Sequence, residues 1–456
     1  MMDTATAARA VDGRILGAPV TFTRVTTDSR AIVAGDLFVA LKGERFDGHD
    51  YVRAALAAGA AAALVADARA DDVEGNLIAV ADPLAALQRL AHHWRLRFDL
   101  PVVAVVGSNG KTTTKEMIAT IFRAAAGAEH VHATAGNFNN AIGVPLTLLG
   151  LRATHRLAVV EMGMNHRGET AELAAMARPT IAVVTNAQRE HQEFMRSVAD
   201  VADEHADAVR ALPVGGVAIV NADDEYVDVW RAAARKAGAL VTEFALTRRA
   251  DVNGRYTPRA DGGELELATR QGDATVALAV PGRHMAANAL AAAAAALAVN
   301  LPLTAIAGGL AAFRAVPGRL TVREGLRGVR VIDDSYNANP DSVRAAIDVL
   351  CSVAGTRILA LGDMGEVGAQ GPQYHREIGA YARTAGVTRL YAAGPSVGET
   401  VQAFGAGALH FDDVDALADR LAADVRAGDT VVVKGSRFMR MERVVAALTG
   451  GAAGHH

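Results

Sequence analysis

The fold of this chain is decided by the stretch Val102-Val103-Ala104-Val105-Val106-Gly107-Ser108-Asn109-Gly110-Lys111-Thr112-Thr113. Its first five residues form an uninterrupted apolar run, which is typical of a strand buried on both faces of a parallel sheet. A short glycine-rich turn follows, and residues 112–126 have the composition of a helix. The sequence therefore predicts a strand, a loop and a helix in direct succession, the frame in which phosphate-binding loops occur.

The loop carries the residue types that bind a triphosphate. Glycine lets backbone N–H groups wrap closely around phosphate, and the N-terminus of the following helix adds favourable dipole charge. Lys111 is suited to neutralise the terminal phosphates, and a hydroxyl of Thr112 or Thr113 to bind Mg²⁺. The usual loop has a glycine where this chain has Val105, so the loop is a shorter variant, and an ordinary tight turn is the alternative. The predicted nucleotide-binding residues are Gly107, Ser108, Asn109, Gly110, Lys111, Thr112 and Thr113.

Similar apolar runs recur on both sides of this stretch, separated by helical patterns. This alternation predicts α/β architecture with doubly wound parallel sheets. The chain has 456 residues, enough for roughly three domains. We expect a small α/β N-terminal domain over residues 1–97, a central P-loop ATPase domain over 98–316 and a Rossmann-like C-terminal domain over 317–456. The strands expected after the first one lie at residues 157–160, 181–185, 217–220, 329–332, 357–361, 389–392 and 430–433.

Composition excludes several classes of protein. Lys and Arg number 46 against 50 Asp and Glu, which argues against a polybasic nucleic-acid or membrane-surface binder. The single cysteine, Cys351, allows no intramolecular disulfide and no thiolate metal cluster, and it fits a reducing, cytoplasmic location. The most apolar stretch, residues 285–299, is too short to span a bilayer, and the start of the chain has no signal-peptide core. The terminal residues His455 and His456 carry no functional prediction.

A metal-binding role is predicted for two residues that follow strands of the central domain. Glu161 lies at the carboxyl end of one predicted strand, and His191 a few residues beyond the next. Ligands of open α/β sheets bind at this edge, and a P-loop that works on the γ-phosphate needs hard ligands for its metal. Taken singly, Glu161 could be a solvated loop acid and His191 a surface histidine.

Together these motifs resemble the Mur ligases of peptidoglycan synthesis, and the resemblance covers nearly the whole chain. Glu161-Met162-Gly163 and His191 match the metal-binding part of that family. The segments around Asp28-Ser29-Arg30 and Gly35 to Gly43 resemble its nucleotide-sugar-binding domain. The stretch Asp333-Asp334-Ser335-Tyr336-Asn337-Ala338-Asn339-Pro340 is similar to the family members that add D-alanyl-D-alanine. Leu361 to Glu366 and Val433 to Arg437 agree with that choice.

The resemblance implies an ATP-dependent amide ligase. UDP-N-acetylmuramoyl-tripeptide and D-alanyl-D-alanine would be joined through an acyl phosphate, giving the pentapeptide, ADP and phosphate for peptidoglycan, and hence for cell shape and division. A related ligase with another acceptor, such as a folate-extending or diaminopimelate-adding enzyme, is one alternative. A P-loop ATPase without ligase activity is another. No nucleic acid or membrane partner is expected, and we expect a monomer.

The resemblance also assigns residue roles. Lys111, His191 and Arg319 would act on the transferring phosphoryl group, and two Mg²⁺ ions would be held by Thr112 with Glu161 and by His191. Both the second and the third domain supply residues, so we expect domain closure during the reaction. The nucleotide would also contact Asn288, Asp334 and Asn337. The substrate-binding residues would be Ser29, Arg30, Lys42 and Gly43 for the UDP end, Asn137 and Asn140 for the muramoyl segment, and Asp363, Glu366, Lys434 and Arg437 for the dipeptide.

One departure from the family concerns a lysine on the helix after the metal histidine. That lysine is usually carbamylated, and its carboxylate serves the second metal, but this chain has no lysine between Lys115 and Lys236. We hypothesise that Glu204 replaces the carbamate, with His205, at the aligned position, as the second choice. A solvated helix face over residues 203–205 is the alternative. Gln188-Arg189-Glu190 also replaces the smaller residues usual before the histidine.

Overall fold

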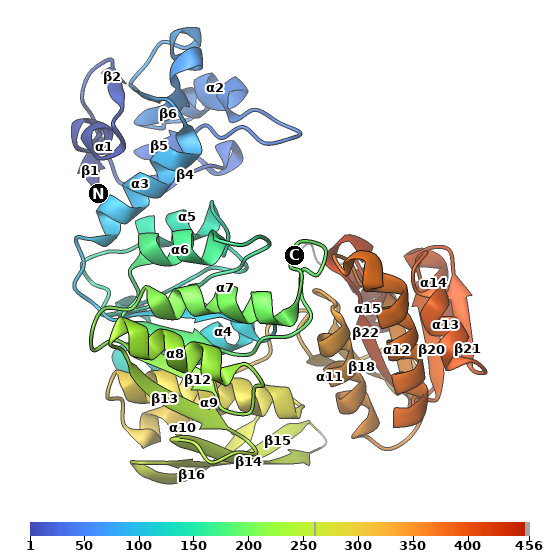
Figure 1. Ribbon diagram of the computed structural model, residues 1–456. Coiled ribbons are helices and arrows are strands. Elements are labelled where there is room, and N and C mark those ends of the chain that lie inside the picture. Colours follow the sequence, from blue (N-terminus) through green and yellow to red (C-terminus); the bar gives the residue numbers. More distant parts are fainter. Residues whose placement is uncertain (260, 452–456) are drawn as a thin grey trace.

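The chain folds into three α/β lobes that follow one another along the sequence, blue, green to yellow, and orange to red in Figure 1. The computed structural model describes residues 1–259 and 261–451. Each lobe is built on its own sheet, with five, nine and six strands, and a two-stranded ribbon accompanies the first. No helix among these residues is long and apolar enough to cross a membrane.

The first lobe has a sheet in the order β2-β7-β6-β5-β4, parallel except for the edge strand β2. Helix α3 leads out of this lobe, and its apolar face joins a hydrophobic core shared with the central lobe. The two lobes are therefore packed together as well as linked. The elements are β1 (Met2–Asp3), α1 (Thr4–Val11), β2 (Arg14–Leu16), β3 (Thr21–Phe22), β4 (Arg24–Thr26), β5 (Asp36–Val39), α2 (Val52–Ala57), β6 (Ala62–Ala66), β7 (Leu77–Val80) and α3 (Pro83–Arg95).

The central lobe contains the predicted parallel sheet, with β8 between β10 and β11. The carboxyl ends of these three strands therefore lie side by side, which is where open α/β sheets bind ligands. Helices α4, α9 and α10 share one core with this sheet, and α6, α7 and α8 share another. The elements are β8 (Val102–Val106), α4 (Lys111–Ala126), β9 (Val131–Ala133), α5 (Gly143–Leu149), β10 (Leu157–Glu161), α6 (Glu169–Ala177), β11 (Ile181–Val184), α7 (Val198–Arg210), β12 (Val217–Asn221), α8 (Val227–Ala237), β13 (Leu240–Ala245), α9 (Arg283–Ala298) and α10 (Leu303–Ala312).

Three further strands extend this sheet, and they were not predicted; nor were β9 and β13. β14 (Val252–Arg259) continues it in parallel, and β15 (Gly262–Thr269) and β16 (Gly272–Leu278) follow antiparallel. Along β15, Leu265 and Leu267 are buried while the residues beside them are partly exposed. This alternation with period 2 is the signal of a half-buried strand, and it is visible in the sequence.

The third lobe has the order β17-β18-β22-β19-β20-β21. The four strands expected here are confirmed, and β17, which is antiparallel to β18, and β21 complete the edges. In the register of β18 and β22, Asp334 lies opposite Lys434, so both side chains reach the same end of the sheet. The elements are β17 (Thr321–Glu324), β18 (Arg330–Asp334), α11 (Pro340–Cys351), β19 (Arg357–Gly362), α12 (Gly371–Ala385), β20 (Arg389–Ala393), α13 (Gly398–Phe404), β21 (Ala408–Phe411), α14 (Val414–Asp424), β22 (Thr430–Lys434) and α15 (Glu442–Thr449).

The alanine-rich helix α9 owes its composition to close packing. Residues 289–296 are fully buried on every side of the helix, between the sheet and helices α4 and α10. Small side chains let neighbouring elements approach closely, so larger ones would force them apart. The apolar run over residues 285–299 is therefore explained by a helix buried in the core of the central lobe.

Enlarging one of these alanines is expected to destabilise the central lobe. Ala293→Leu should lower the free energy of unfolding by about 1–3 kcal/mol, because the added atoms overpack a filled core. Denaturant unfolding followed by the fluorescence of the buried Trp230 measures this. The matched control is Ala311→Leu on the exposed side of α10. Equal stability of the two variants would contradict the packing argument.

Candidate active site

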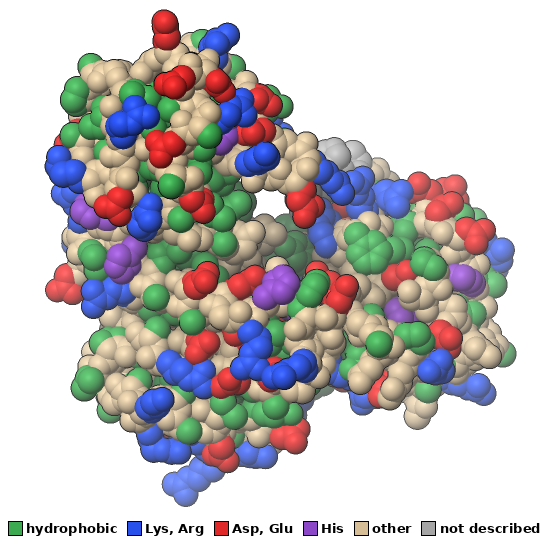
Figure 2. All heavy atoms as spheres, turned by 45° about the horizontal axis from the view of Figure 1, so that its top comes forward, with side chains coloured by type: hydrophobic (Ala, Val, Ile, Leu, Met, Phe, Trp, Pro, Cys, Tyr) green, Lys and Arg blue, Asp and Glu red, His purple; other side chains and the backbone are tan. Residues whose placement is uncertain are grey.

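A large cavity lies between the central and third lobes, and Figure 2 shows the molecule hollowed where the lobes meet. Its volume is about 1220 Å³, more than a drug-sized ligand needs. The ends of β8, β10 and β11 face those of β18 and β22 across it. The predicted site residues that line it are Ser108, Asn109, Gly110, Lys111, Thr112, Thr113, Asn137, Asn140, Glu161, His191, Asn288, Arg319, Asp334, Asn337, Glu366, Lys434 and Arg437.

The turn between β8 and α4 requires its two glycines. Gly107 has φ 134°, and a Cβ there would lie 2.0 Å from the Oγ1 of Thr185. Gly110 has φ 84°, and a Cβ there would lie 2.4 Å from the Oδ1 of Asn288. Both values of φ are in the region that favours glycine. A side chain at either position would therefore collide with a neighbouring residue and disturb the turn.

Glu161 has an arrangement that fits a magnesium ion. The hydroxyl of Thr112 donates to Glu161 Oε1 at 3.0 Å, and the Nδ2 of Asn139 donates to the same oxygen at 2.7 Å. The other oxygen, Oε2, is buried without a hydrogen-bond partner among the described residues. A buried carboxylate oxygen is costly to leave unpaired, so the pair Thr112 and Glu161 fits a hard cation at this point.

The protein does not supply a complete metal cage. Within residues 1–259 and 261–451, no three His, Cys, Asp or Glu side chains are already grouped around a common point. This agrees with Mg²⁺ chemistry, because Mg²⁺ keeps several waters and usually binds through one or two carboxylates together with substrate phosphates.

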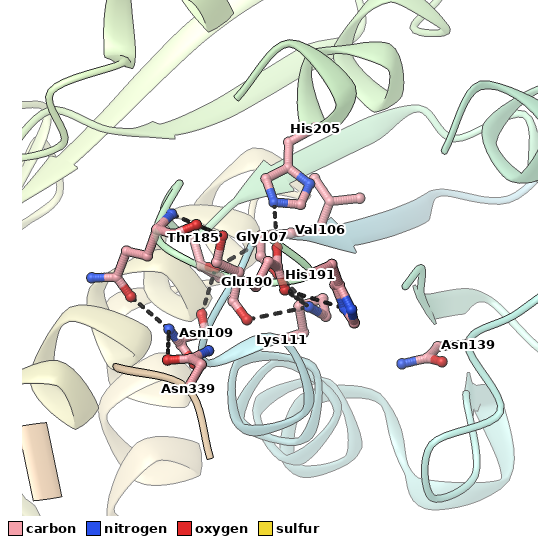
Figure 3. Close-up of polar contacts among 12 residues, drawn as sticks. Val106, Gly107, Asn109, Lys111, Asn139, Thr185, Glu190, His191, His205 and Asn339 are labelled. Atoms are coloured by element: carbon pink, nitrogen blue, oxygen red, sulfur yellow. Dashed lines mark hydrogen bonds and ion pairs between the residues drawn. The ribbon is translucent and has the colours of Figure 1, made fainter. Parts of the chain in front are cut away.

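A second buried carboxylate, that of Glu190, lies close to the P-loop lysine (Figure 3). Its Oε2 is 3.4 Å from Lys111 Nζ and 3.8 Å from His191 Nε2, and its Oε1 is 3.0 Å from His205 Nε2. Lys111 Nζ also donates to the carbonyl of Gly107 at 2.5 Å. Burial opposes ionisation of Glu190, but the neighbouring Lys111 and the two histidines together lower the pKa of Glu190 to about 2. The carboxylate is therefore charged at neutral pH.

The third lobe contributes a charged pair at the opposite wall. Lys434 Nζ donates to Asp334 Oδ2 at 2.6 Å and to the carbonyl of Asn337 at 2.8 Å. Burial raises the pKa of Asp334, against the opposing influence of Lys434. The guanidinium of Arg319 stacks over the ring of Tyr336, 4.1 Å from its centroid. These residues come together because β18 and β22 are neighbours.

Contacts across the cavity join the central lobe to the third. Arg189 donates to both carboxylate oxygens of Asp341, with a shortest distance of 2.7 Å, and to Glu377 at 2.6 Å. His191 Nδ1 lies 2.6 Å from Glu366 Oε2, an ion-pair contact rather than a well-aligned hydrogen bond. These three acids come from helices α11 and α12 and from the loop after β19. The loop over residues 188–193 is thus the main polar bridge between the two lobes.

In the structure Glu204 has backbone partners and lies away from the predicted metal site. Its Oε2 accepts from the N–H of Gly168 and its Oε1 from the N–H of Thr170, both at 2.8 Å. Helix α6 begins between these residues, so Glu204 satisfies N–H groups that the start of a helix leaves free. It is buried and does not line the cavity. Its neighbour His205, the second choice, instead reaches Glu190.

Asp363 also lies away from the cavity. Its Oδ1 accepts from the N–H groups of Ser396 and Val397, at 3.0 and 2.8 Å, and the residue is buried. The carboxylate holds the loop between β20 and α13 in this structure, and the predicted contact with a dipeptide stays a prediction. Gly107 likewise does not line the cavity and acts through its backbone shape.

The four residues predicted for the UDP end lie in the first lobe and do not line the cavity. Ser29 and Arg30 follow Asp28, whose carboxylate accepts from the guanidinium of Arg30 at 2.9 Å. Lys42 and Gly43 are exposed on a separate loop. Their role stays a prediction.

Three residues of the site were not predicted from the sequence: Asn139, Arg189 and Glu190. His205 was the second choice as a metal ligand, but its contact with Glu190 was not predicted. Asn139 lies between the predicted residues Asn137 and Asn140, and nothing in the sequence pattern distinguishes its side-chain amide from theirs. Arg189 and Glu190 were noticed as larger than usual before the histidine, which was the available signal. The conformation of this loop decides where those side chains point, and the spacing of residues in the sequence does not determine it.

Comparison with known proteins gives matches along almost the whole chain. Three family models match in succession: "Mur ligase family, catalytic domain" over residues 21–95, "Mur ligase middle domain" over 105–296 and "Mur ligase, glutamate ligase domain" over 318–437. Among curated relatives, the UDP-N-acetylmuramoyl-tripeptide--D-alanyl-D-alanine ligase of Escherichia coli is 41% identical over 442 residues, which is 96% of each chain.

Solved structures agree with these matches. The crystal structure of MurF from Acinetobacter baumannii superposes with a TM-score of 0.90 at 32% identity, covering 98% of each chain. MurF ligase from Thermotoga maritima, solved in complex with ADP, gives a TM-score of 0.82 at 27% identity over 93% of this chain and 96% of that one. The three-lobed architecture is thus that of MurF structures.

Removal of the Glu204 carboxylate is expected to affect stability and not metal dependence. Glu204→Ala should cost roughly 0.5–2 kcal/mol of folding free energy, as the loss of a helix cap does. The Mg²⁺ dependence of nucleotide binding, measured by calorimetry, should stay as in the wild type. The control is Asp203→Ala, whose exposed ion pairs with arginines contribute little. A changed Mg²⁺ dependence in Glu204→Ala alone would support its predicted metal role.

His284 at the cavity wall is expected to make the fold sensitive to acid. Burial, with the positive charge of Lys434, lowers its pKa to about 4. The unfolded chain binds the proton more tightly, so stability is fully present above the usual pKa of about 6.5 and is lost as the pH falls toward about 4.

We therefore expect the fall in Tm between about pH 7 and about pH 4.5 to be smaller in His284→Gln than in the wild type. Thermal unfolding at a series of pH values measures it. The control is His166→Gln, because His166 is largely exposed. Identical pH profiles for His284→Gln and the wild type would contradict the prediction.

Proposed function

The chain belongs to the Mur ligase family, and from that premise we infer how its residues join D-alanyl-D-alanine to UDP-N-acetylmuramoyl-tripeptide. It is an ATP-dependent ligase of peptidoglycan precursor synthesis. Relatives that match it over nearly their full length are named UDP-N-acetylmuramoyl-tripeptide--D-alanyl-D-alanine ligase or MurF. The observation that carries the residue assignments is the cavity in which the P-loop of the central lobe faces Asp334 and Lys434 of the third.

The reaction has two steps in this proposal. The terminal carboxylate of the tripeptide attacks the γ-phosphorus of ATP, the bond to the β-phosphate oxygen breaks, and an acyl phosphate and ADP result. The free amine of the dipeptide then attacks the acyl carbon, loses a proton, and expels inorganic phosphate. Both steps bring anions together, so the site must supply positive charge where the phosphoryl group moves.

Lys111 and Arg319 supply that charge from the two lobes. Lys111 lies at the N-terminus of α4, and this helix end lines the cavity together with the loop before it. Arg319 lines the cavity from the third lobe and is held over Tyr336. Bound Mg²⁺ would neutralise the phosphates and orient them for transfer. We assign Thr112 and Glu161 to one ion and His191 to a second.

The remaining assignments follow the walls of the cavity. Asn288, which packs against Gly110, and Asn337 would contact the nucleotide. Asp334 lies beside Asn337 and would meet the ribose hydroxyls. For the zwitterionic dipeptide we propose an anion near its amine and cations near its carboxylate. The proposed substrate-binding residues are Glu366, Lys434 and Arg437 for the dipeptide, Asn137 and Asn140 for the muramoyl segment, and Ser29, Arg30, Lys42 and Gly43 for the UDP end.

We further propose that the three sheets mark three domains, with boundaries near residues 97 and 316, which fall between α3 and β8 and between α10 and β17. We propose that the enzyme works as a monomer. A cytoplasmic location fits the unpaired Cys351 and the use of ATP.

Phosphate release tests the ligase assignment. We expect release from ATP only when UDP-N-acetylmuramoyl-tripeptide and D-alanyl-D-alanine are both present, with the pentapeptide detected by mass spectrometry. Lys111→Ala should lower the rate on the order of 10²–10³-fold, the usual effect of losing one charge-stabilising group.

The control for this assay is Lys236→Ala, because Lys236 lies in the last turn of α8, away from the cavity. Release of phosphate without either substrate would favour the P-loop ATPase alternative. Formation of product with another acceptor in place of the dipeptide would favour a related ligase.

A further inference from the structure

Glu190 has no part in the reaction described above, yet its carboxylate is buried at the phosphate end of the cavity. The residue is 6% exposed and lines the cavity within 3.4 Å of the P-loop lysine. A buried charge is costly unless it is paired. In the structure Lys111 is the cation that pairs with it, and His191 and His205 are its other polar neighbours.

Nucleotide binding changes this balance. The lysine of a P-loop contacts the β- and γ-phosphates, and Lys111 cannot neutralise both the phosphates and Glu190. A buried carboxylate beside a triphosphate would then face only anions on that side. Such a site binds nucleotide well only when another cation joins the two groups, and a divalent ion with oxygen ligands is suited to do so.

We propose that Glu190 and His191 hold the second Mg²⁺ together, and that His205 positions the Glu190 carboxylate for it. The inference rests on the ATP-dependent ligase function given above. It places a direct protein carboxylate at the second ion, in a segment where the chain has no lysine between Lys115 and Lys236.

The geometry of Glu190 and His191 suits one shared ion. Mg²⁺ binds octahedrally at about 2.0–2.1 Å, so two ligands of one ion lie roughly 2.9 Å apart when adjacent and roughly 4.1 Å apart when opposite. Glu190 Oε2 and His191 Nε2 are 3.8 Å apart, so a side-chain movement of about 1 Å brings them to the adjacent spacing. The other ring nitrogen of His191, Nδ1, lies 2.6 Å from Glu366 Oε2. A carboxylate at one nitrogen of a histidine is the usual arrangement when the other nitrogen binds a metal.

His205 meets the requirements of a positioning residue. It lies on α7, is 1% exposed, and its Nε2 is 3.0 Å from Glu190 Oε1. This contact fixes one carboxylate oxygen and leaves Oε2 directed toward His191 and Lys111 (Figure 3). Hydrogen bonds to ligating carboxylates set their orientation in metal sites. The positioning residue His205 thus lies on a helix, α7, whereas the proposed ligand Glu190 lies in a loop.

The first test measures the affinity of a non-hydrolysable ATP analogue by calorimetry, with EDTA and with Mg²⁺, in the wild type and in Glu190→Gln. The measured quantity is the ratio of Kd in EDTA to Kd in Mg²⁺. In EDTA, Glu190→Gln should bind at least as tightly as the wild type, because an anion beside the phosphates is gone. In Mg²⁺ it should bind more weakly, so that the ratio falls roughly 10–100-fold.

A purely structural role for Glu190 predicts something different. Loss of a structural ion pair would raise Kd equally in EDTA and in Mg²⁺ and leave the ratio unchanged. An unchanged ratio therefore overturns the proposal, whether or not both affinities fall. The matched control is Glu193→Gln, an exposed acid on the same loop, which should keep the wild-type ratio.

The second test counts ions and examines His205. With the same analogue, electron paramagnetic resonance of Mn²⁺ should show two bound ions per wild-type chain and one in Glu190→Gln. His205→Ala should weaken one of the two ions, and His205→Gln, which keeps a side-chain donor, should restore part of that affinity. Two ions of wild-type affinity in Glu190→Gln, or no difference between the two His205 variants, would overturn the corresponding part of the proposal.

Neither measurement needs the peptide substrates or turnover. If ligation with D-alanyl-D-alanine were absent while the Mg²⁺ ratio fell as expected, the proposed function would be wrong and the metal site would stand. If ligation were observed and the ratio did not change, only the metal site would be wrong.

Discussion

The structure depends on one electrostatic constraint: negative charge gathered in a half-closed cavity must be matched by positive charge at short range. Lys111 shows the constraint most directly, since its ammonium lies between the Gly107 carbonyl and the Glu190 carboxylate. Lys434 does the same for Asp334 across the cavity. A triphosphate, a peptide carboxylate and the acids of the site repel one another unless cations are placed between them. The strand ends that form the cavity are where such cations and loop N–H groups can be brought together.

Much of the fold could be predicted because its signals are local. The apolar runs of β8, β10, β11 and β12 mark strands buried on both faces, and the glycines of the loop mark the phosphate site. The antiparallel extension β14–β16 was missed although alternation in β15 announces it. There the apolar residues are spread among charged ones, and this pattern is less visible than a continuous run.

The site was predicted less completely because it depends on side-chain direction. Adjacent residues on a helix point about 100° apart, so Glu204 and His205 on α7 reach different places, one the start of α6 and the other Glu190. The sequence identified the segment but not which residue faces the cavity. Asp363 is a similar case, since its carboxylate turns toward the loop before α13. Gly107 and Gly110 were easier to predict, because the turn between β8 and α4 requires glycine there.

The loop over residues 188–193 couples ligand binding at the P-loop to the association of the central lobe with the third lobe. Arg189 is bound to Asp341 and Glu377 of the third lobe, His191 touches Glu366 of the same lobe, and Glu190 between them faces the P-loop. Consecutive residues cannot move independently over such short distances. Any ligand that draws Glu190 toward itself therefore shifts the free energy of lobe association, and lobe association shifts the affinity for that ligand by the same amount. The loop is a reciprocal coupling element, and its stiffness sets how much binding energy passes from the P-loop to the third lobe.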